Sequence, residues 1–184
     1  QAIFLAIFGY LFLKEKISKL TLTSIILAIS GILLMVGSSL SPGQFLGNLV
    51  AFIMPSSFAV LIIIVRKYPN VDMVPLQLFA GIVAALIGYF ISTKIIISAN
   101  DLFLAFIAGF FQVGLGFIFI TRGAKKTLSA MVGILMMTEA VFGPLWAWIF
   151  LNEKPEFIAL IGGSIIIFAV FIQFYSLLVK EKKA

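Results

Sequence analysis

Glu139 is the only charged residue in an apolar stretch that runs from Leu128 to Asn152. If this stretch is one membrane helix, Glu139 lies about 15 Å along it, near the bilayer midplane. A charged residue such as Asp costs roughly 2.5–3.5 kcal/mol at that depth. The carboxylate should therefore face protein or a water-filled cavity. It is either a proton-linked or cation-binding group or a structural Glu that hydrogen-bonds across helices.

Pro144 lies on the same stretch and follows Gly143, which weakens a helix further. Its ring supplies no amide and clashes with the carbonyl of Ala140, so the sequence predicts a kink beside Glu139. A carboxylate next to a broken helix is typical of binding sites in transporters. The alternative is a Pro that neighbouring helices tolerate. Thr138, the polar residue directly before Glu139, is also a candidate site residue.

Gln112 is a second candidate for substrate contact. It forms a stripe with Ala105, Gly109 and Gly116, at spacings that place all four on one face of an α-helix. Small residues permit close approach either of a partner helix or of a ligand, and close helix packing is the more common use. Gln112 itself could hydrogen-bond a substrate or Glu139.

Two further polar or aromatic residues complete the candidate site. Trp146 is seven residues from Glu139 on roughly the same helix face, where it could wall a cavity or stack on a cationic substrate. The alternative for Trp146 is packing or a membrane-interface belt. Ser56 follows Pro55 and could contact substrate, although a serine in a helix often bonds its own backbone. The predicted site is thus Glu139, Gln112, Trp146, Thr138, Pro144 and Ser56.

The composition places these residues in a membrane protein. Of the 184 residues, 62% are hydrophobic and only 11% are charged, whereas a soluble domain is near one quarter charged. The chain has no Cys and no His, which excludes disulfides and imidazole or thiolate metal sites, and leaves no nucleophile paired with a His. No phosphate-binding loop is present. We therefore predict no enzyme activity, no cofactor, no metal and no nucleic-acid partner.

Long apolar segments separated by short polar breaks predict an all-α architecture, because an isolated segment in lipid must satisfy its own backbone. An apolar run from Ala2 to Leu13 is too short to span, and the chain opens on Gln1. We therefore expect a fragment that begins inside a helix. In the break at residues 98–101, Asn100 or Asp101 is expected to cap the helix predicted at 102–121. The predicted full spans are 22–38, 45–65, 73–93, 102–121, 128–151 and 157–178.

Basic residues predict the orientation of the chain. Counting the short first helix, alternation of seven helices assigns all but two of the 13 Lys and Arg residues to one side. The exceptions are Lys94 and Lys154. The positive-inside rule makes the rich side cytoplasmic, so the C-terminus is predicted to be cytoplasmic and the membrane to be the inner or plasma membrane.

A short motif occurs twice. Phe12-Leu13-Lys14-Glu15-Lys16 matches Phe150-Leu151-Asn152-Glu153-Lys154 at an offset of 138 residues (153 − 15). Each copy closes one helix and precedes another. Five helices separate equivalent positions, so the second copy must be inverted in the membrane, a recurring transporter design.

These residues, together with Pro144 to Pro155 and Gly162-Gly163, resemble the EamA family of the drug/metabolite transporter superfamily. Lys14 and Asn152 stand where the family pattern has Gly. The resemblance implies ten helices in two inverted five-helix halves, of which this chain would hold the C-terminal seven. Residues 1–38 would be the last two helices of the first repeat, 39–179 the complete second repeat, and 180–184 a basic cytoplasmic tail.

The resemblance also implies function. Such proteins are secondary transporters that look like exporters of small metabolites or drugs, with a site near the midplane between the halves. Basic residues are absent from the helix interiors, which disfavours phosphorylated anions as substrates. A seven-helix receptor or sensor and a non-transporting membrane protein are the alternatives. The expected partners are a small-molecule substrate and the lipid bilayer, with proton coupling and a homodimer left open.

Overall fold

The structure, a computed structural model, describes residues 1–36, 50–92 and 97–181. The predicted boundary between repeats at 38/39, parts of the spans predicted at 22–38, 45–65 and 73–93, and most of the predicted basic tail lie outside these ranges. Within them the chain forms helices and no strands, which confirms the all-α prediction. The helices are α1 (Ala2–Leu13), α2 (Lys19–Val36), α4 (Ile53–Lys67), α5 (Val74–Ile91), α6 (Ala99–Ile107), the π-helix η2 (Ala108–Leu115), α7 (Gly116–Ala124), α8 (Ser129–Met136), α9 (Thr138–Leu151) and α10 (Phe157–Glu181).

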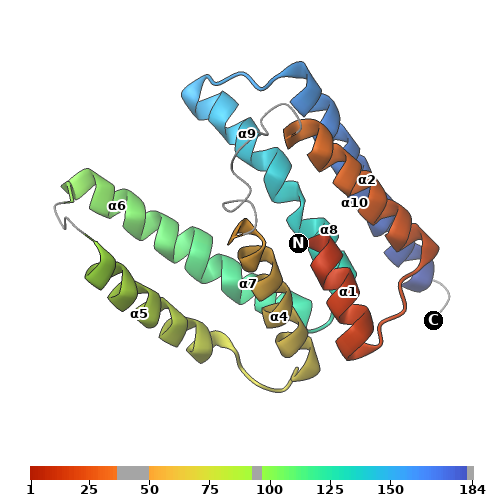
Figure 1. The fold of residues 1–184 in the computed structure, drawn as a ribbon, viewed down its shortest axis with the longest axis horizontal. Coiled ribbons are helices and arrows are strands. Elements are labelled where there is room, and N and C mark those ends of the chain that lie inside the picture. The colour runs from red at the N-terminus through yellow and green to blue at the C-terminus, as the bar shows by residue number, and fades with distance from the viewer. Residues whose placement is uncertain (37–49, 93–96, 182–184) are drawn as a thin grey trace. The chain divides into compact units, whose positions relative to one another are not determined.

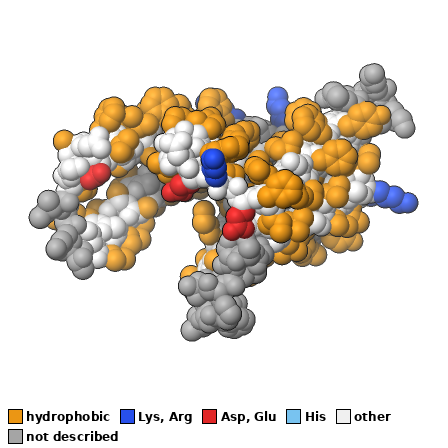
Figure 2. All heavy atoms as spheres, turned by 90° about the horizontal axis from the view of Figure 1, so that it is seen from above, with side chains coloured by type: hydrophobic (Ala, Val, Ile, Leu, Met, Phe, Trp, Pro, Cys, Tyr) orange, Lys and Arg blue, Asp and Glu red, His pale blue; other side chains and the backbone are white. Residues whose placement is uncertain are grey.

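Among the described residues, four stretches are long and apolar enough to cross a membrane. They are Val74–Ile91, Ala99–Ala124, Ser129–Leu151 and Phe157–Ser176, in close agreement with the last four predicted spans. Hydrophobic side chains cover most of the face shown in Figure 2, with charges confined to a few positions. Phe90, for example, is 82% exposed, and α5 has no buried residue. Exposed apolar surface of this extent belongs against lipid, so the chain is an all-α membrane protein.

The chain divides into two compact units, residues 1–64 with 127–184 and residues 65–126. In the second unit, two basic side chains tie the connections to the helix ends. Arg66 donates a hydrogen bond from Nη1 to the carbonyl of Ala124 (3.0 Å), and Lys125 donates from Nζ to the carbonyl of Val71 (2.9 Å). The unit therefore gathers basic residues at one end of its helices.

The first unit is built on the antiparallel pair α2 and α10, which lie side by side (Figure 1). They approach closely at Gly31 and Gly162, where a Cβ on Gly31 would lie 2.6 Å from the Gly162 carbonyl oxygen. Ala28, Ile166 and Ala169 are fully buried and extend this contact. Small residues thus allow close helix packing, which is the usual basis of helix association in lipid.

Helix α1 packs against α8 in the same unit, again through small residues. A Cβ on Gly133 would lie 2.6 Å from the Cα of Ala2. At the other end of α1, a Cβ on Gly9 would lie 3.0 Å from the Cβ of Ser129. These two glycines fix the distance between the helices, because neither position has room for a larger residue.

The two copies of the repeated motif fold alike. Lys14 (φ 53°) and Asn152 (φ 57°) end α1 and α9 in the left-handed conformation, and they are the non-glycine residues with positive φ among those described. The amide of the following Glu15 then reaches back to the carbonyl of Gly9 (3.1 Å), as that of Glu153 does to Ala147 (3.4 Å). Left-handed helix caps usually carry Gly, in agreement with the family pattern at both positions.

The cap of α6 differs from the one expected. The helix begins at Ala99, and Ser98 is its cap, since the Ser98 hydroxyl accepts a hydrogen bond from the amide of Asp101 (3.1 Å). The prediction that Asn100 or Asp101 is the cap is therefore wrong. Ser98 is itself a favoured capping residue, and the helix starts earlier than its apolar pattern.

Candidate functional site

The helix that carries Glu139 is interrupted two residues before it. Helix α8 ends at Met136 and α9 begins at Thr138, with Met137 in a turn. The amide of Met137 bonds the carbonyl of Ile134 (3.1 Å), and the amide of Ala140 bonds that of Met137 (3.2 Å). Both bonds span three residues instead of four, so the chain makes a tight turn within an otherwise continuous apolar stretch.

Thr138 and Glu139 lie in the first turn after this interruption. The hydroxyl of Thr138 donates to the carbonyl of Leu135 (2.7 Å) and so supports the turn. Glu139 is exposed and is the acidic residue in the first turn of α9. A carboxylate is favoured at a helix N-terminus, because the free amides there carry partial positive charge. Glu139 therefore occupies a position that acidic side chains prefer in a helix.

Glu139 lines a pocket of about 270 Å³. The pocket lies within the first unit, between the start of α9 and α2, and its other lining residues are Gln1, Ile32, Met136, Met137 and Ala140. Methionine side chains adapt to ligands of different shape. A carboxylate among such residues can bind a proton or a cationic group.

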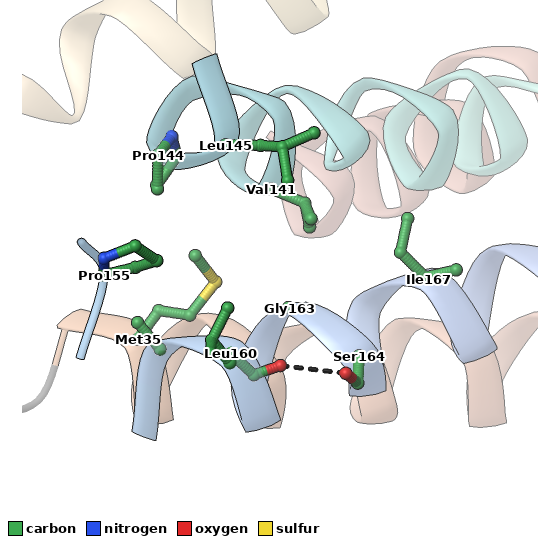
Figure 3. A pocket seen from close by; sticks show the side chains of 10 residues that line it. Met35, Val141, Pro144, Leu145, Pro155, Leu160, Gly163, Ser164 and Ile167 are labelled. Atoms are coloured by element: carbon green, nitrogen blue, oxygen red, sulfur yellow. Dashed lines mark hydrogen bonds between the residues drawn. The ribbon is translucent and has the colours of Figure 1, made fainter. Parts of the chain in front are cut away.

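Pro144 lies on a different pocket. Helix α9 continues through Pro144, and the break in the helix lies earlier, at Met137. Pro144 lines a groove of about 290 Å³ together with Met35, Val141, Leu145, Pro155, Ala159, Leu160, Gly163, Ser164 and Ile167. Figure 3 shows Val141, Pro144 and Leu145 on α9 opposite Leu160, Gly163 and Ile167 on α10. The Ser164 hydroxyl there donates to the carbonyl of Leu160 (2.9 Å), so the groove surface is largely apolar.

The other predicted site residues take less distinctive positions. Trp146 is 52% exposed, and its ring centroid lies 5.6 Å from that of Phe150 on the same helix. Ser56 donates from its hydroxyl to the carbonyl of Phe52 (2.7 Å), which is the backbone bond expected of a helical serine. These contacts leave the Trp146 ring available to lipid or ligand and occupy the proton of Ser56.

Gln112 belongs to the second compact unit, whereas Glu139 belongs to the first. It is exposed and lies within the π-helix η2. A Cβ on Gly109 or Gly116 would meet no atom within 4 Å, so no helix within the described part of residues 65–126 packs at these positions. The π-helical turn also shifts the α-helical register from which the stripe was drawn. Such turns are frequent at functional sites.

Sequence reasoning missed one interaction near the repeated motif. The carboxylate of Glu15 accepts a hydrogen bond from the amide of Ser129 (2.9 Å) and another from its hydroxyl (3.2 Å). The two residues are 114 positions apart, so only the tertiary structure brings them together. Two features of the sequence pointed to this contact. Ser is a residue type favoured at helix starts, and the first copy of the repeated motif places an acidic residue, Glu15, just after a helix end.

Comparison with known proteins places most of the chain in one family. Residues 41–175 match the EamA-like transporter family. Neither the curated proteins nor the solved structures give a match. The matched range contains α4 to α9 and most of α10, and therefore the α9 and α10 residues of both pockets, whereas Gln1, Ile32 and Met35 precede it.

Proposed function

We propose that this chain, which belongs to the EamA-like transporter family, exports a small organic solute by secondary active transport. The family makes it a membrane transporter, and the proposal adds direction, site and coupling. The observation that carries it is the position of Glu139. This carboxylate lies directly after a helix interruption, at mid-length of an apolar stretch, and lines a pocket. Transporters of several folds bind substrate at such broken helices near the midplane.

The architecture that we propose is the inverted repeat. Two turns at an offset of 138 residues (152 − 14) share a left-handed residue and the same backbone hydrogen bond. Helices α2 and α10 occupy equivalent places after these turns and pack antiparallel on a glycine pair. Equivalent helices of inverted repeats run in opposite directions, so this packing supports the proposal. The two halves would then rock about the site to expose it to either side.

The charges favour a cationic or neutral solute. Glu139 is the acidic residue within the described stretch Ser129–Leu151, and that stretch contains no Lys or Arg. An anionic substrate would meet an uncompensated like charge in this pocket, which is costly away from water. A proton or an organic cation would neutralise the carboxylate. Proton exchange through Glu139 is therefore our proposal for coupling.

The proposed orientation places the C-terminus in the cytoplasm of a cell bounded by this membrane. Arg66 and Lys125 lie at one end of the second unit, as the positive-inside distribution requires of residues on one side. The homodimer stays a prediction from the sequence.

Transport and coupling are tested together in proteoliposomes that contain a trapped pH indicator. The full-length protein is supplied with a panel of amino acids, amines and cationic dyes across an imposed pH gradient. We expect solute-dependent proton movement in the parent protein and its loss in Glu139→Gln. Glu153→Gln is the matched control, because Glu153 is an exposed Glu outside the membrane helices.

The outcomes separate the parts of the proposal. Flux with unchanged pH dependence in Glu139→Gln would contradict coupling through this carboxylate. Saturable binding of a panel compound without flux in any direction would contradict transport and would favour a receptor or sensor.

A further inference from the structure

The turn after α1 holds a carboxylate against the start of α8. Glu15 accepts hydrogen bonds from both the amide and the hydroxyl of Ser129, at 2.9 Å and 3.2 Å. Ser129 is fully buried and is the first residue of α8, where the amides have no partner within the helix. A carboxylate at a helix start satisfies such an amide and interacts favourably with the helix dipole.

The backbone around Glu15 is shaped for this contact. The left-handed Lys14 turns the chain, and the amide of Glu15 bonds the carbonyl of Gly9. Gly9 leaves the space for the carboxylate, because a Cβ there would lie 2.9 Å from Oε2 of Glu15. Three features therefore position one side chain, and the charge-assisted bonds that it makes are stronger than those between neutral groups.

The equivalent turn after α9 lacks such a contact. Glu153 follows a left-handed residue and makes the matching backbone hydrogen bond, but it is exposed, and its carboxylate has no hydrogen-bond partner among the described residues. The turn geometry alone thus does not generate the interaction. The Glu15–Ser129 contact depends on the packing of α1 against α8.

The contact joins segments that we assign to different halves of the transporter. Helix α1 belongs to the proposed first repeat and α8 to the second. Rocking of the halves about a central site must separate some contacts at each membrane face. Glu15 and Ser129 lie at the end of α1 and the start of α8, and α8 leads directly to the interruption at Met137 and to Glu139.

We propose that the Glu15–Ser129 pair is a latch that closes one face of the transport pathway. The inference rests on the proposed two-half transporter. With the latch formed, the start of α8 is held against the end of α1. When the latch parts, α8 is free to move away from α1, and the pocket at Glu139 opens to the membrane face on which Glu15 lies.

The 184 residues contain no Cys, so a cysteine introduced here can be labelled alone once any Cys elsewhere in the full-length protein is replaced by Ser. Met136, which lines the pocket with Glu139, is replaced by Cys in the full-length protein. Its rate of modification by a membrane-impermeant maleimide is measured from each membrane face in vesicles of both orientations. We expect Glu15→Ala to raise the rate from the Glu15 face about tenfold, which corresponds to about 1.4 kcal/mol. Glu153→Ala should leave that rate unchanged.

Two substitutions at Ser129 make the test independent of Glu15. Ser129→Ala removes the hydroxyl and keeps the amide, so its effect should be smaller than that of Glu15→Ala. Ser129→Pro removes both donors at the first position of a helix, where Pro is well tolerated. It should reproduce the effect of Glu15→Ala while the protein keeps its elution profile in detergent.

The results distinguish the latch from the proposed function. If the maleimide modifies the Met136→Cys protein at the same rate from both faces, and no solute of the panel changes that rate, both alternating access and the latch are contradicted. If the rates differ between the faces but adding Glu15→Ala or Ser129→Pro leaves them unchanged, only the latch is contradicted. An equal increase from both faces would also overturn it, because that result indicates general loosening of the helices.

Discussion

Glu139 and Pro144 lie five residues apart on α9 (144 − 139) but line two different pockets. Five residues on an α-helix turn the side chains toward different faces. Glu139 faces the pocket that includes Met136 and Ile32, whereas Pro144 faces the apolar groove along α10. The carboxylate and the proline can therefore be altered separately, although their closeness in sequence suggested one site.

The first prediction concerns Pro144→Ala. Alanine restores the amide that can bond the carbonyl of Ala140 and removes the clash of the proline ring, which in a soluble helix costs about 3 kcal/mol. We expect a higher unfolding temperature in detergent and an unchanged pH dependence of transport. Both are measured beside Glu139→Gln, which is expected to alter pH dependence. A shift in pH dependence caused by Pro144→Ala would show that the two pockets act as one.

The second prediction concerns the glycine contact between α2 and α10. In Gly31→Ala the new Cβ would lie 2.6 Å from a backbone oxygen of Gly162, which cannot move without displacing the helix. Overpacking of this kind typically costs about 1–3 kcal/mol. The loss should appear as a lower midpoint of thermal unfolding in detergent. Gly81→Ala is the control, since no atom lies within 4 Å of its Cβ position, and it should be neutral or stabilising.

The third prediction concerns the left-handed residues Lys14 and Asn152. Most side chains pay about 1–2 kcal/mol for this conformation, but Asn tolerates it better. Lys14→Gly should therefore stabilise the protein more than Asn152→Gly does in thermal unfolding. Lys16→Gly, which has no positive φ to relieve, serves as the control. An equal or larger gain for Asn152→Gly would contradict the assignment of strain to Lys14.

The fourth prediction concerns Ser24, which is fully buried on α2. Its hydroxyl oxygen has no hydrogen-bond partner among the described residues. An unpaired buried polar atom typically costs about 1–3 kcal/mol, so Ser24→Ala should be neutral or stabilising in thermal unfolding. Ser30→Ala is the control on the same helix, because Ser30 is exposed and bonds its own backbone. A clear loss of stability in Ser24→Ala would indicate an internal water or other partner for this hydroxyl.

The spans were predictable because the bilayer imposes length and composition on each helix independently. The predicted ranges 128–151 and 157–178 differ by only a few residues from the observed Ser129–Leu151 and Phe157–Glu181. The repeated motif could likewise be recognised in the sequence, since both copies lie at helix ends, where the local sequence determines the turn.

The interior of the helices was less predictable. The sequence predicted a kink at Pro144, which stays a prediction, but it gave no sign of the tight turn at Met137, a residue with no helix-breaking tendency of its own. Packing of Gly133 against Ala2 holds α8 next to α1, and α9 then departs from the end of this contact. The π-helix around Gln112 and the bond between Glu15 and Ser129 also depend on neighbours that a single sequence does not reveal.

The reciprocal contact of Gly31 and Gly162 has a consequence for how the helices hold together in lipid. The Cβ position of each glycine points at the carbonyl oxygen of the other, so a Cα hydrogen of each is directed at that oxygen. Weak Cα–H···O interactions of this kind contribute about 0.5–1 kcal/mol each. Apolar burial gives little preference for protein over lipid tails. The cohesion of α2 and α10 at this point therefore comes from polar backbone atoms, in a form that a more hydrophobic side chain could not replace.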